Sequence, residues 1–326
     1  MPRTIPVIDL SDALEGSAEV RHRLAVRLDK ACREIGFFTL VGHGIPVAVL
    51  DELRATANSF FALPLDEKRR AIHPVVGTPR GYRTQGIEAL SYGNDRETPP
   101  DLKEYYHFGR ETWPDEPYFT GPEGRRYFIP NLWPARPAGF KEAARRYYAE
   151  MERISLVLMR LAALALGADE HFFDAKIDRH ITAMRLNFYP AQTVAPLPGQ
   201  LRAGEHTDYG NFTILNGENA PGGLQVRTRS GEWIDVETEP SSFVVNIGDL
   251  LMRWTNDRWV SNAHRVVNPP VSAARAQRLS IAFFHHPNYD ALIACIAPPG
   301  EAKYAPVRSG DYRDLKYRQT RVAPRP

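Results

Sequence analysis

The feature that most limits the fold is a series of short strand-like runs between about residues 180 and 290. These runs are rich in β-branched and aromatic residues and span 182–189, 211–215, 223–228, 243–247, 263–267 and 278–284. Glycine, proline and other turn-forming residues mark their ends. A long series of short strands is typical of an antiparallel sandwich or barrel. The sequence therefore predicts a mostly β protein, with the helices outside the β core.

The N-terminal half is predicted to be largely helical. Apolar residues recur every three or four positions within 20–35, 49–60 and 138–166, as expected for core-facing helices. Between the first two helices, the β-branched and aromatic run 37–41 predicts a buried strand. The stretch 77–134 is rich in glycine, proline, tyrosine and charge. We expect it to be irregular and to form either one wall or lid of a cavity or a surface excursion.

The domain organisation is expected to be simple, because the sequence has no internal repeat and no low-complexity linker. We predict one domain over 1–326. Within it, 1–134 is an N-terminal helical and irregular region covering the barrel, and 138–167 is a long support helix. Residues 180–290 form the catalytic β core, and 291–326 form a C-terminal arm.

Charge and cysteine content narrow the functional class. The net charge of +2 comes from 41 basic and 39 acidic residues that are interspersed, which argues against nucleic-acid binding. No apolar run reaches membrane-spanning length, and the N-terminus leads directly into a strand-like run without the pattern of a signal peptide. Cys32 and Cys295 have no metal-type spacing and are expected to be free thiols. We therefore expect a cytoplasmic protein, monomeric or weakly homo-oligomeric, that acts on a small molecule.

A candidate metal site centres on His206 and Asp208, which are separated by one residue. On an extended backbone such residues point to the same face and can bind one ion. With His264 as a third ligand they would form the two-histidine, one-carboxylate site of non-haem Fe(II) oxygenases. If His264 were not the ligand, His285 or His286 would replace it, although these neighbours point to opposite faces. The alternative interpretation is a histidine hydrogen-bonded beside a turn aspartate.

The order of the motifs supports the iron interpretation. They are Ile5-Pro6-Val7-Ile8-Asp9, Gly36-Phe37-Phe38, Gly42-His43-Gly44-Ile45, Arg80-Gly81-Tyr82, Asp101-Leu102-Lys103-Glu104, Arg185-Leu186-Asn187-Phe188-Tyr189-Pro190, His206-Thr207-Asp208, Gly222-Gly223-Leu224-Gln225-Val226, Asn246-Ile247-Gly248-Asp249, His264-Arg265-Val266 and Arg278-Leu279-Ser280. In this order the chain resembles the isopenicillin N synthase-like group of Fe(II)/2-oxoglutarate-dependent dioxygenases. The resemblance implies a double-stranded β-helix, or jelly-roll, core with flanking helices.

The resemblance also implies a binding site for 2-oxoglutarate. Arg278 is the expected anchor, because a guanidinium binds a carboxylate through two parallel hydrogen bonds. Ser280 lies two residues further along the same strand face and adds a hydroxyl group. Tyr189 is a further donor, and its combination with Asn187 is typical of the enzymes that use 2-oxoglutarate.

The reaction implied by the resemblance consumes 2-oxoglutarate and molecular oxygen, releases succinate and carbon dioxide, and oxidises a C–H bond of a small molecule. Hydroxylation is the default outcome, and desaturation, ring closure, epoxidation and ethylene formation remain open. One alternative is an iron oxidase that binds a substrate carboxylate with the arginine and needs no 2-oxoglutarate. Another is a non-enzymatic jelly-roll binding protein. A zinc hydrolase is disfavoured, because no general base accompanies the ligands.

The expected substrate contacts begin with Arg185, which shares a strand face with Tyr189 if period-two alternation holds. Together with Arg80 or Tyr82 and with Phe212, it would contact a small polar substrate bearing a carboxylate or carbonyl oxygen. The alternative is that Arg185 only pairs with a structural carboxylate.

Overall fold

Two β-sheets form the centre of the protein, which is described here by a computed structural model over residues 4–11, 13, 16–91 and 98–319. The large sheet has the order β1 (Val7–Asp9), β2 (Phe37–Val41), β10 (Phe243–Ile247), β7 (Phe212–Gly217), β12 (Arg278–Phe284), β5 (Ala183–Tyr189), β4 (Glu104–Gly109) and β3 (Gly81–Arg83). The small sheet has the order β6 (Ala203–His206), β11 (His264–Val266), β8 (Leu224–Arg227) and β9 (Trp233–Val236). Only the pairing of β1 with β2 is parallel among these strands. The mostly antiparallel sheets confirm the predicted jelly-roll core.

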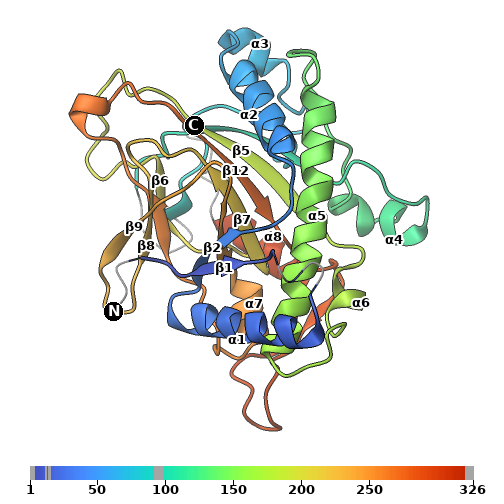
Figure 1. Ribbon diagram of the computed structural model, residues 1–326. Helices are drawn as coiled ribbons and strands as arrows, with labels where there is room; N and C mark the ends of the chain where they lie inside the picture. The colour runs from blue at the N-terminus through green and yellow to red at the C-terminus, as the bar shows by residue number, and fades with distance from the viewer. Residues whose placement is uncertain (1–3, 12, 14–15, 92–97, 320–326) are drawn as a thin grey trace.

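Helices cover the side of the large sheet that faces away from the small sheet. The long helix α5 (Phe140–Ala165) runs alongside the large sheet, and α1 (Ala18–Glu34) and α2 (Val47–Phe61) pack against α5 (Figure 1). Apolar side chains of these helices and of the large sheet form one buried cluster. None of the described helices combines the length and apolarity needed to span a bilayer.

The first helix shows how local sequence sets the fold. Ser17 caps α1 by accepting a hydrogen bond from the backbone nitrogen of Val20. Gly36 follows the helix with a φ of +70°, and a Cβ added there would lie 1.9 Å from the carbonyl oxygen of Val260. Glycine is therefore required at the point where the chain turns from α1 into β2.

Smaller elements complete the described structure. They are α3 (Leu65–Arg69), α4 (Pro117–Thr120), the 3-10 helix η2 (Gly124–Arg126), α6 (Asp174–Ile177), α7 (Asp249–Trp254), the 3-10 helix η3 (Val271–Ala273), the pair β13 (Leu292–Ile293) and β14 (Val307–Arg308), and α8 (Ser309–Gln319). The expected C-terminal arm contains β13, β14 and α8, and its residues 320–326 lie outside the described residues.

Most predicted elements are confirmed, and β2, β10 and β12 have the predicted bounds. The expectation of an irregular stretch over 77–134 is wrong in one respect, because this stretch supplies β3 and β4 to the large sheet. Every residue of β4 is buried, including the charged Glu104, which pairs with Lys68 at 2.8 Å. A strand buried on both faces lacks the alternation that identifies half-exposed strands.

Candidate active site

The three expected metal ligands meet at one edge of the small sheet. His206 ends β6 and His264 begins β11, and the two residues are direct partners in the antiparallel pairing. Asp208 lies in the loop after β6. One ligand atom from each residue lies within 4.8 Å of the other two. The predicted convergence is therefore present, although a loop rather than strand alternation brings in the carboxylate.

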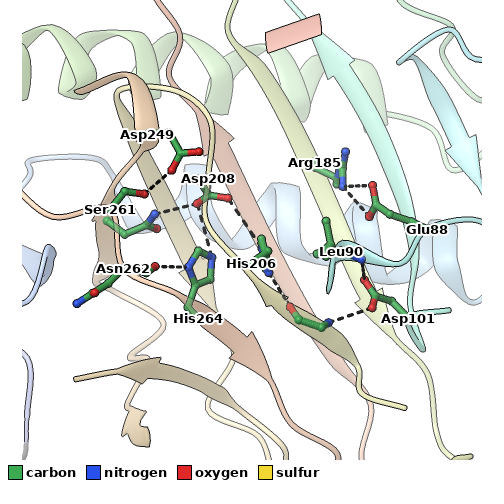
Figure 2. Close-up of polar contacts among 12 residues, drawn as sticks. Glu88, Leu90, Asp101, Arg185, His206, Asp208, Asp249, Ser261, Asn262 and His264 are labelled. Carbon is green, nitrogen blue, oxygen red and sulfur yellow. Dashed lines mark hydrogen bonds and ion pairs between the residues drawn. The ribbon is translucent and has the colours of Figure 1, made fainter. Parts of the chain in front are cut away.

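Hydrogen bonds orient the two imidazole rings. Nδ1 of His206 lies 2.7 Å from the carbonyl oxygen of Gly204, and Nδ1 of His264 lies 3.2 Å from that of Asn262 (Figure 2). A carbonyl oxygen only accepts, so each Nδ1 carries the hydrogen and each Nε2 keeps its lone pair for a metal. Nε2 of His206 and of His264 lie 3.9 and 3.7 Å from the carboxylate oxygens of Asp208.

The protonation states suit a divalent cation. Burial and the neighbouring His264 lower the pKa of His206 to about 3, so this ring is neutral at physiological pH. Burial alone would raise the pKa of Asp208, but the two histidines and hydrogen bonds from Thr213 and Asn246 hold it below its ordinary value. Neutral imidazoles with one carboxylate are the donor set that Fe(II) takes in non-haem oxygenases. The residues present therefore fit the metal.

The alternative ligands do not join this group. His286 lines the same pocket, but neither it nor His285 belongs to the cluster of possible ligands among the described residues. The histidine of the Gly42-His43-Gly44 motif is also structural, as its ring contacts the carbonyl oxygen of Ser241 at 3.0 Å.

The expected 2-oxoglutarate residues lie on the large sheet, where they form two cross-strand pairs. Arg278 is opposite Tyr189, and Ser280 is opposite Asn187. All four side chains line the pocket that also contains the metal ligands. Arg278 is 1% exposed, yet its Nε and Nη2 atoms have no hydrogen-bond partner in the described structure. Burial lowers the pKa of Arg278, but a guanidinium stays charged in proteins.

A buried charge with free donors is unfavourable unless an anion binds to it. The surroundings leave room for one. Gly217 lies beside the guanidinium, and a Cβ added there would come within 2.9 Å of Nη2. Apolar side chains from both sheets enclose the space in front of Arg278, namely Leu215, Leu224 and Val266. This part of the pocket therefore fits a small dicarboxylate with one end at Arg278 and the other at the metal ligands.

Another wall of the pocket is a charged network, of which Figure 2 shows the pair of Arg185 with Glu88. Nη1 of Arg185 donates to both oxygens of Glu88 at 3.1 and 3.0 Å, and Nζ of Lys103 contacts Glu88 at 2.9 Å and Asp101 at 3.1 Å. Burial raises the pKa of Glu88, but Arg185 and Lys103 together lower it to about 2. Arg185 thus lines the pocket as expected and also pairs with a carboxylate, as the alternative interpretation required.

Arg80, Tyr82 and Phe212 do not line this pocket, so their expected substrate contact is wrong. Arg80 donates to the carbonyl oxygen of Ile129 at 3.0 Å, and the hydroxyl of Tyr82 donates to Glu104. Tyr82 belongs to β3 at the far edge of the large sheet, and Arg80 immediately precedes this strand. Phe212 lies in the hydrophobic core, because strand alternation on β7 points Thr213 and Leu215 into the pocket instead.

Several pocket residues were not predicted. They include Glu88, Lys103, Tyr209, Phe284 and Tyr317. Strand alternation from Arg278 and Ser280 would have found Phe284, which lies on the same face of β12. No sequence pattern places Tyr317 there, because it reaches the pocket from the distant helix α8.

Comparison with known proteins agrees with this geometry. Residues 5–136 match the family described as non-haem dioxygenase in morphine synthesis N-terminal, and 181–287 match the 2OG-Fe(II) oxygenase superfamily. The 2-oxoglutarate-Fe(II) type oxidoreductase hxnY of Emericella nidulans is 33% identical over 98% of this chain and 91% of its own length. A homoarginine-6-hydroxylase of Oryza sativa subsp. japonica is 33% identical over 95% of each chain.

A solved structure supports the same assignment. A full-length protein of Neurospora crassa, crystallised in complex with alpha-KG (2-oxoglutarate) and thymine, superposes with a TM-score of 0.82 at 33% identity. The match covers 97% of this chain and 96% of the Neurospora crassa chain.

Fold and site together define a non-haem iron oxygenase with a jelly-roll core. The sequence matches are specific enough to go further. The chain belongs to the 2OG-Fe(II) oxygenase superfamily, and its cofactor and cosubstrates are Fe(II), 2-oxoglutarate and molecular oxygen.

Proposed function

We propose that the protein hydroxylates a C–H bond of a small polar molecule, with His206, Asp208 and His264 as the iron ligands. One observation carries this proposal. The three ligands on the small sheet and the buried, partly unpaired Arg278 on the large sheet open onto one pocket. When bound there, Fe(II) with 2-oxoglutarate and oxygen supplies the oxidant, and succinate and carbon dioxide are released.

The protein's own residues bind, orient and exclude water. Arg278 holds the far carboxylate of 2-oxoglutarate through its free donors, assisted by the hydroxyls of Ser280 and Tyr189. Asn187 lies opposite Ser280, and its Oδ1 atom is buried without a partner in the described structure. Asn246 donates to Asp208 at 2.8 Å and fixes the carboxylate. The apolar walls keep water from the reacting atoms.

The rival reaction is that of an oxidase, in which Arg278 would bind a substrate carboxylate instead. Relatives named for their use of 2-oxoglutarate support the oxygenase. A non-enzymatic binding protein is disfavoured, because the ligand cluster is complete and its histidines are held in the metal-binding tautomer.

The test is the stoichiometry of the reaction. Protein reconstituted with Fe(II) is supplied with 2-oxoglutarate, oxygen and a panel of small molecules, and succinate and oxidised product are quantified. We expect substrate-stimulated succinate release and an oxygen atom added to the product. Product formation that proceeds equally well without 2-oxoglutarate would establish the oxidase reaction instead.

The polar group of the substrate is expected to be a carbonyl rather than a carboxylate. Arg185 already shares its charge with Glu88, so it is not available as an uncompensated cation on this wall. The small molecules named for the relatives differ in charge. The Neurospora crassa protein is seen with thymine, whereas other relatives are named homoarginine hydroxylases. A small molecule with a neutral polar edge is the class that we propose here.

Other properties are proposed on simpler grounds. We infer one domain, because a single core cluster includes side chains from Ile8 to Ile293. We infer a reducing compartment, such as the cytoplasm, because Cys32 and Cys295 are both free. A monomer or weak homo-oligomer remains our prediction, to be checked by light scattering.

A further inference from the structure

One wall of the pocket is used by neither the metal ligands nor the cosubstrate residues. This wall, called here the polar wall, consists of Arg185 and Glu88, supported from behind by Lys103 and Asp101. The side chains of Lys103 and Asp101 are 3% and 2% exposed, so the support is buried. A buried polar network is unfavourable unless its donors and acceptors form hydrogen bonds. In the polar wall, two groups can each form a further hydrogen bond.

The spare capacity is one donor and one acceptor. Nε of Arg185 is buried and has no hydrogen-bond partner in the described structure, and Arg185 as a whole is 8% exposed. Glu88 accepts from Arg185 and Lys103, and a carboxylate with these partners keeps lone pairs on its two oxygens. A ligand that presents an acceptor and a donor side by side would satisfy both groups.

Charge balance restricts the ligand further. The polar wall pairs two cations with two anions, so it carries no net charge. In the loaded site, Fe(II), the two carboxylates of 2-oxoglutarate, Asp208 and Arg278 also balance one another. Among the described residues that line the pocket, none carries a charge left over to compensate a charged substrate, so burying one there would be strongly unfavourable. The pocket selects a neutral molecule.

Aromatic groups indicate the shape of the ligand. Phe284, Tyr209 and Tyr317 line the pocket together with the polar wall. The guanidinium of Arg185 lies 4.3 Å from the ring centroid of Tyr105, which holds it in one orientation. Flat aromatic surfaces beside a fixed donor and acceptor favour a planar ring over a flexible chain.

We propose that the substrate is a neutral, planar ring with an amide-type edge, as in a lactam, an imide or a pyrimidine base. Its carbonyl oxygen accepts from Arg185, and the adjacent N–H donates to Glu88. This inference rests on the proposed function and adds the recognition element to it. Arg185 and Glu88 are specificity-determining residues. Lys103 is a positioning residue that contacts Glu88, and Asp101 holds Lys103 in place.

The first test is binding measured by calorimetry, with Fe(II) and 2-oxoglutarate present and oxygen excluded. The probes are thymine and glutarimide, compared with cyclohexanecarboxylate and cyclohexylamine, which are rings of similar size but opposite charge. We expect the two amide-type rings to bind at least tenfold more tightly than either charged ring. Tighter binding of the carboxylate or of the amine would overturn the proposal.

The second test uses Glu88→Gln, with Glu52→Gln as the matched control. Glu52 forms an exposed ion pair with Arg146 on the helical side of the protein. In Glu88→Gln the polar wall gains a net positive charge, so we expect weaker binding of glutarimide and stronger binding of cyclohexanecarboxylate. The control should bind both probes like the wild type. An unchanged probe preference in Glu88→Gln would contradict the proposal.

A third variant keeps the test decisive if Glu88→Gln fails to fold. Arg185→Lys retains the cation but removes the Nε donor, and it should weaken glutarimide binding about tenfold while 2-oxoglutarate still binds. Wild-type affinity for glutarimide in this variant would refute the role of Arg185. Amide binding without succinate release would leave the recognition intact and refute the proposed function. Succinate release stimulated only by the charged probes would support the proposed function and refute the recognition of an amide-type ring.

Discussion

Oδ1 of Asp101 accepts a hydrogen bond from the backbone nitrogen of Gly204 at 2.9 Å. The carbonyl oxygen of the same glycine receives the Nδ1 hydrogen of the metal ligand His206 at 2.7 Å (Figure 2). One residue thus connects the polar wall of the pocket to the orientation of an iron ligand. Mutation of a group that orients a ligand ring typically lowers metal affinity or activity by about 10- to 100-fold.

Asp101→Ala should weaken both the fold and the metal site. Its other oxygen lies 3.1 Å from Lys103, and breaking such a buried pair costs about 3 to 5 kcal/mol. Iron affinity should fall by about 10- to 100-fold. Urea unfolding and metal titration measure the two effects. The control Asp66→Ala, in an exposed ion pair with Arg69, should change neither by more than the scatter of the measurement.

The ligand assignment predicts different outcomes for two histidines of the same pocket. His264→Ala should lose stoichiometric iron and all turnover while its far-UV circular dichroism stays unchanged. His286→Ala should retain iron, because this side chain lines the pocket without joining the ligand cluster. Iron content of the purified proteins distinguishes the two. Full iron binding by His264→Ala would show that the assignment is wrong.

The 2-oxoglutarate assignment predicts a specific loss for Arg278. Removing one partner of a buried charge pair costs about 3 to 5 kcal/mol, so Arg278→Ala should raise the KM for 2-oxoglutarate by about two to four orders of magnitude. Arg278→Lys should fail as well, because a point charge cannot replace the two-pronged guanidinium. Iron binding should stay normal in both variants. A normal KM for 2-oxoglutarate in Arg278→Lys would contradict the assignment.

The sequence was most informative where residue type and strand alternation act together. Alternation predicted that Arg278 and Ser280 share one strand face and that Asn187 and Tyr189 share another. The structure adds the register, which places Arg278 opposite Tyr189 and Ser280 opposite Asn187. The proposed ligands His206 and His264 were selected by residue type and motif order, since β6 was not among the predicted strands. The metal and cosubstrate residues were therefore proposed from residue type, strand alternation and the order of the family motifs, and their roles stay predictions.

The substrate side of the pocket was poorly predicted for physical reasons. Glu88 lies in a loop, and its position depends on long-range pairing with Arg185 and Lys103. Tyr317 comes from a helix far along the chain, and nothing in its local sequence indicates which surface it contacts. Tyr82 lies in the edge strand β3 and Arg80 directly before it, in a segment where glycine and proline obscured the strand in the sequence. Contacts set by tertiary packing leave no local signal.

Buried histidines outside the metal site predict how stability depends on pH. Burial lowers the pKa of His107 and of His285 well below the ordinary value of 6.5. The unfolded chain therefore takes up protons near pH 6.5 that the folded chain does not, and stability falls as the pH falls. The loss is about 1.4 kcal/mol per histidine for each pH unit below 6.5. Carboxylates such as Glu88, with a pKa of about 2, do not contribute to this loss of stability near pH 6.5, because they take up protons only at a much lower pH.

Urea unfolding at pH 7.5 and 5.5 measures this effect. His107→Gln should lose less stability on acidification than the wild type, by about 1.4 kcal/mol. The exposed His22 gives a control, since His22→Gln should behave like the wild type. Equal losses in His107→Gln and the wild type would show that His107 does not carry the dependence.

The C-terminal helix is expected to control how much succinate is formed for each molecule of oxidised product. In α8, Nζ of Lys316 contacts Asp249 at 2.9 Å, and the hydroxyl of Tyr312 donates to the same carboxylate at 3.1 Å. The backbone nitrogen of Asp249 in turn donates to the carbonyl oxygen of Asp208 at 2.7 Å. The helix that places Tyr317 at the pocket is thus fixed to the loop that carries an iron ligand.

Tyr317→Ala should therefore weaken substrate binding and admit water. An aromatic contact contributes about 0.5 to 1.5 kcal/mol, so the KM for the substrate should rise about two- to tenfold. Water in the opened pocket should also increase the succinate formed per molecule of product, because exclusion of solvent prevents side reactions. Tyr304→Ala is the control, since Tyr304 instead contacts Asp257 away from the pocket and should leave both quantities unchanged. A wild-type ratio of succinate to product in Tyr317→Ala would show that α8 does not seal the site.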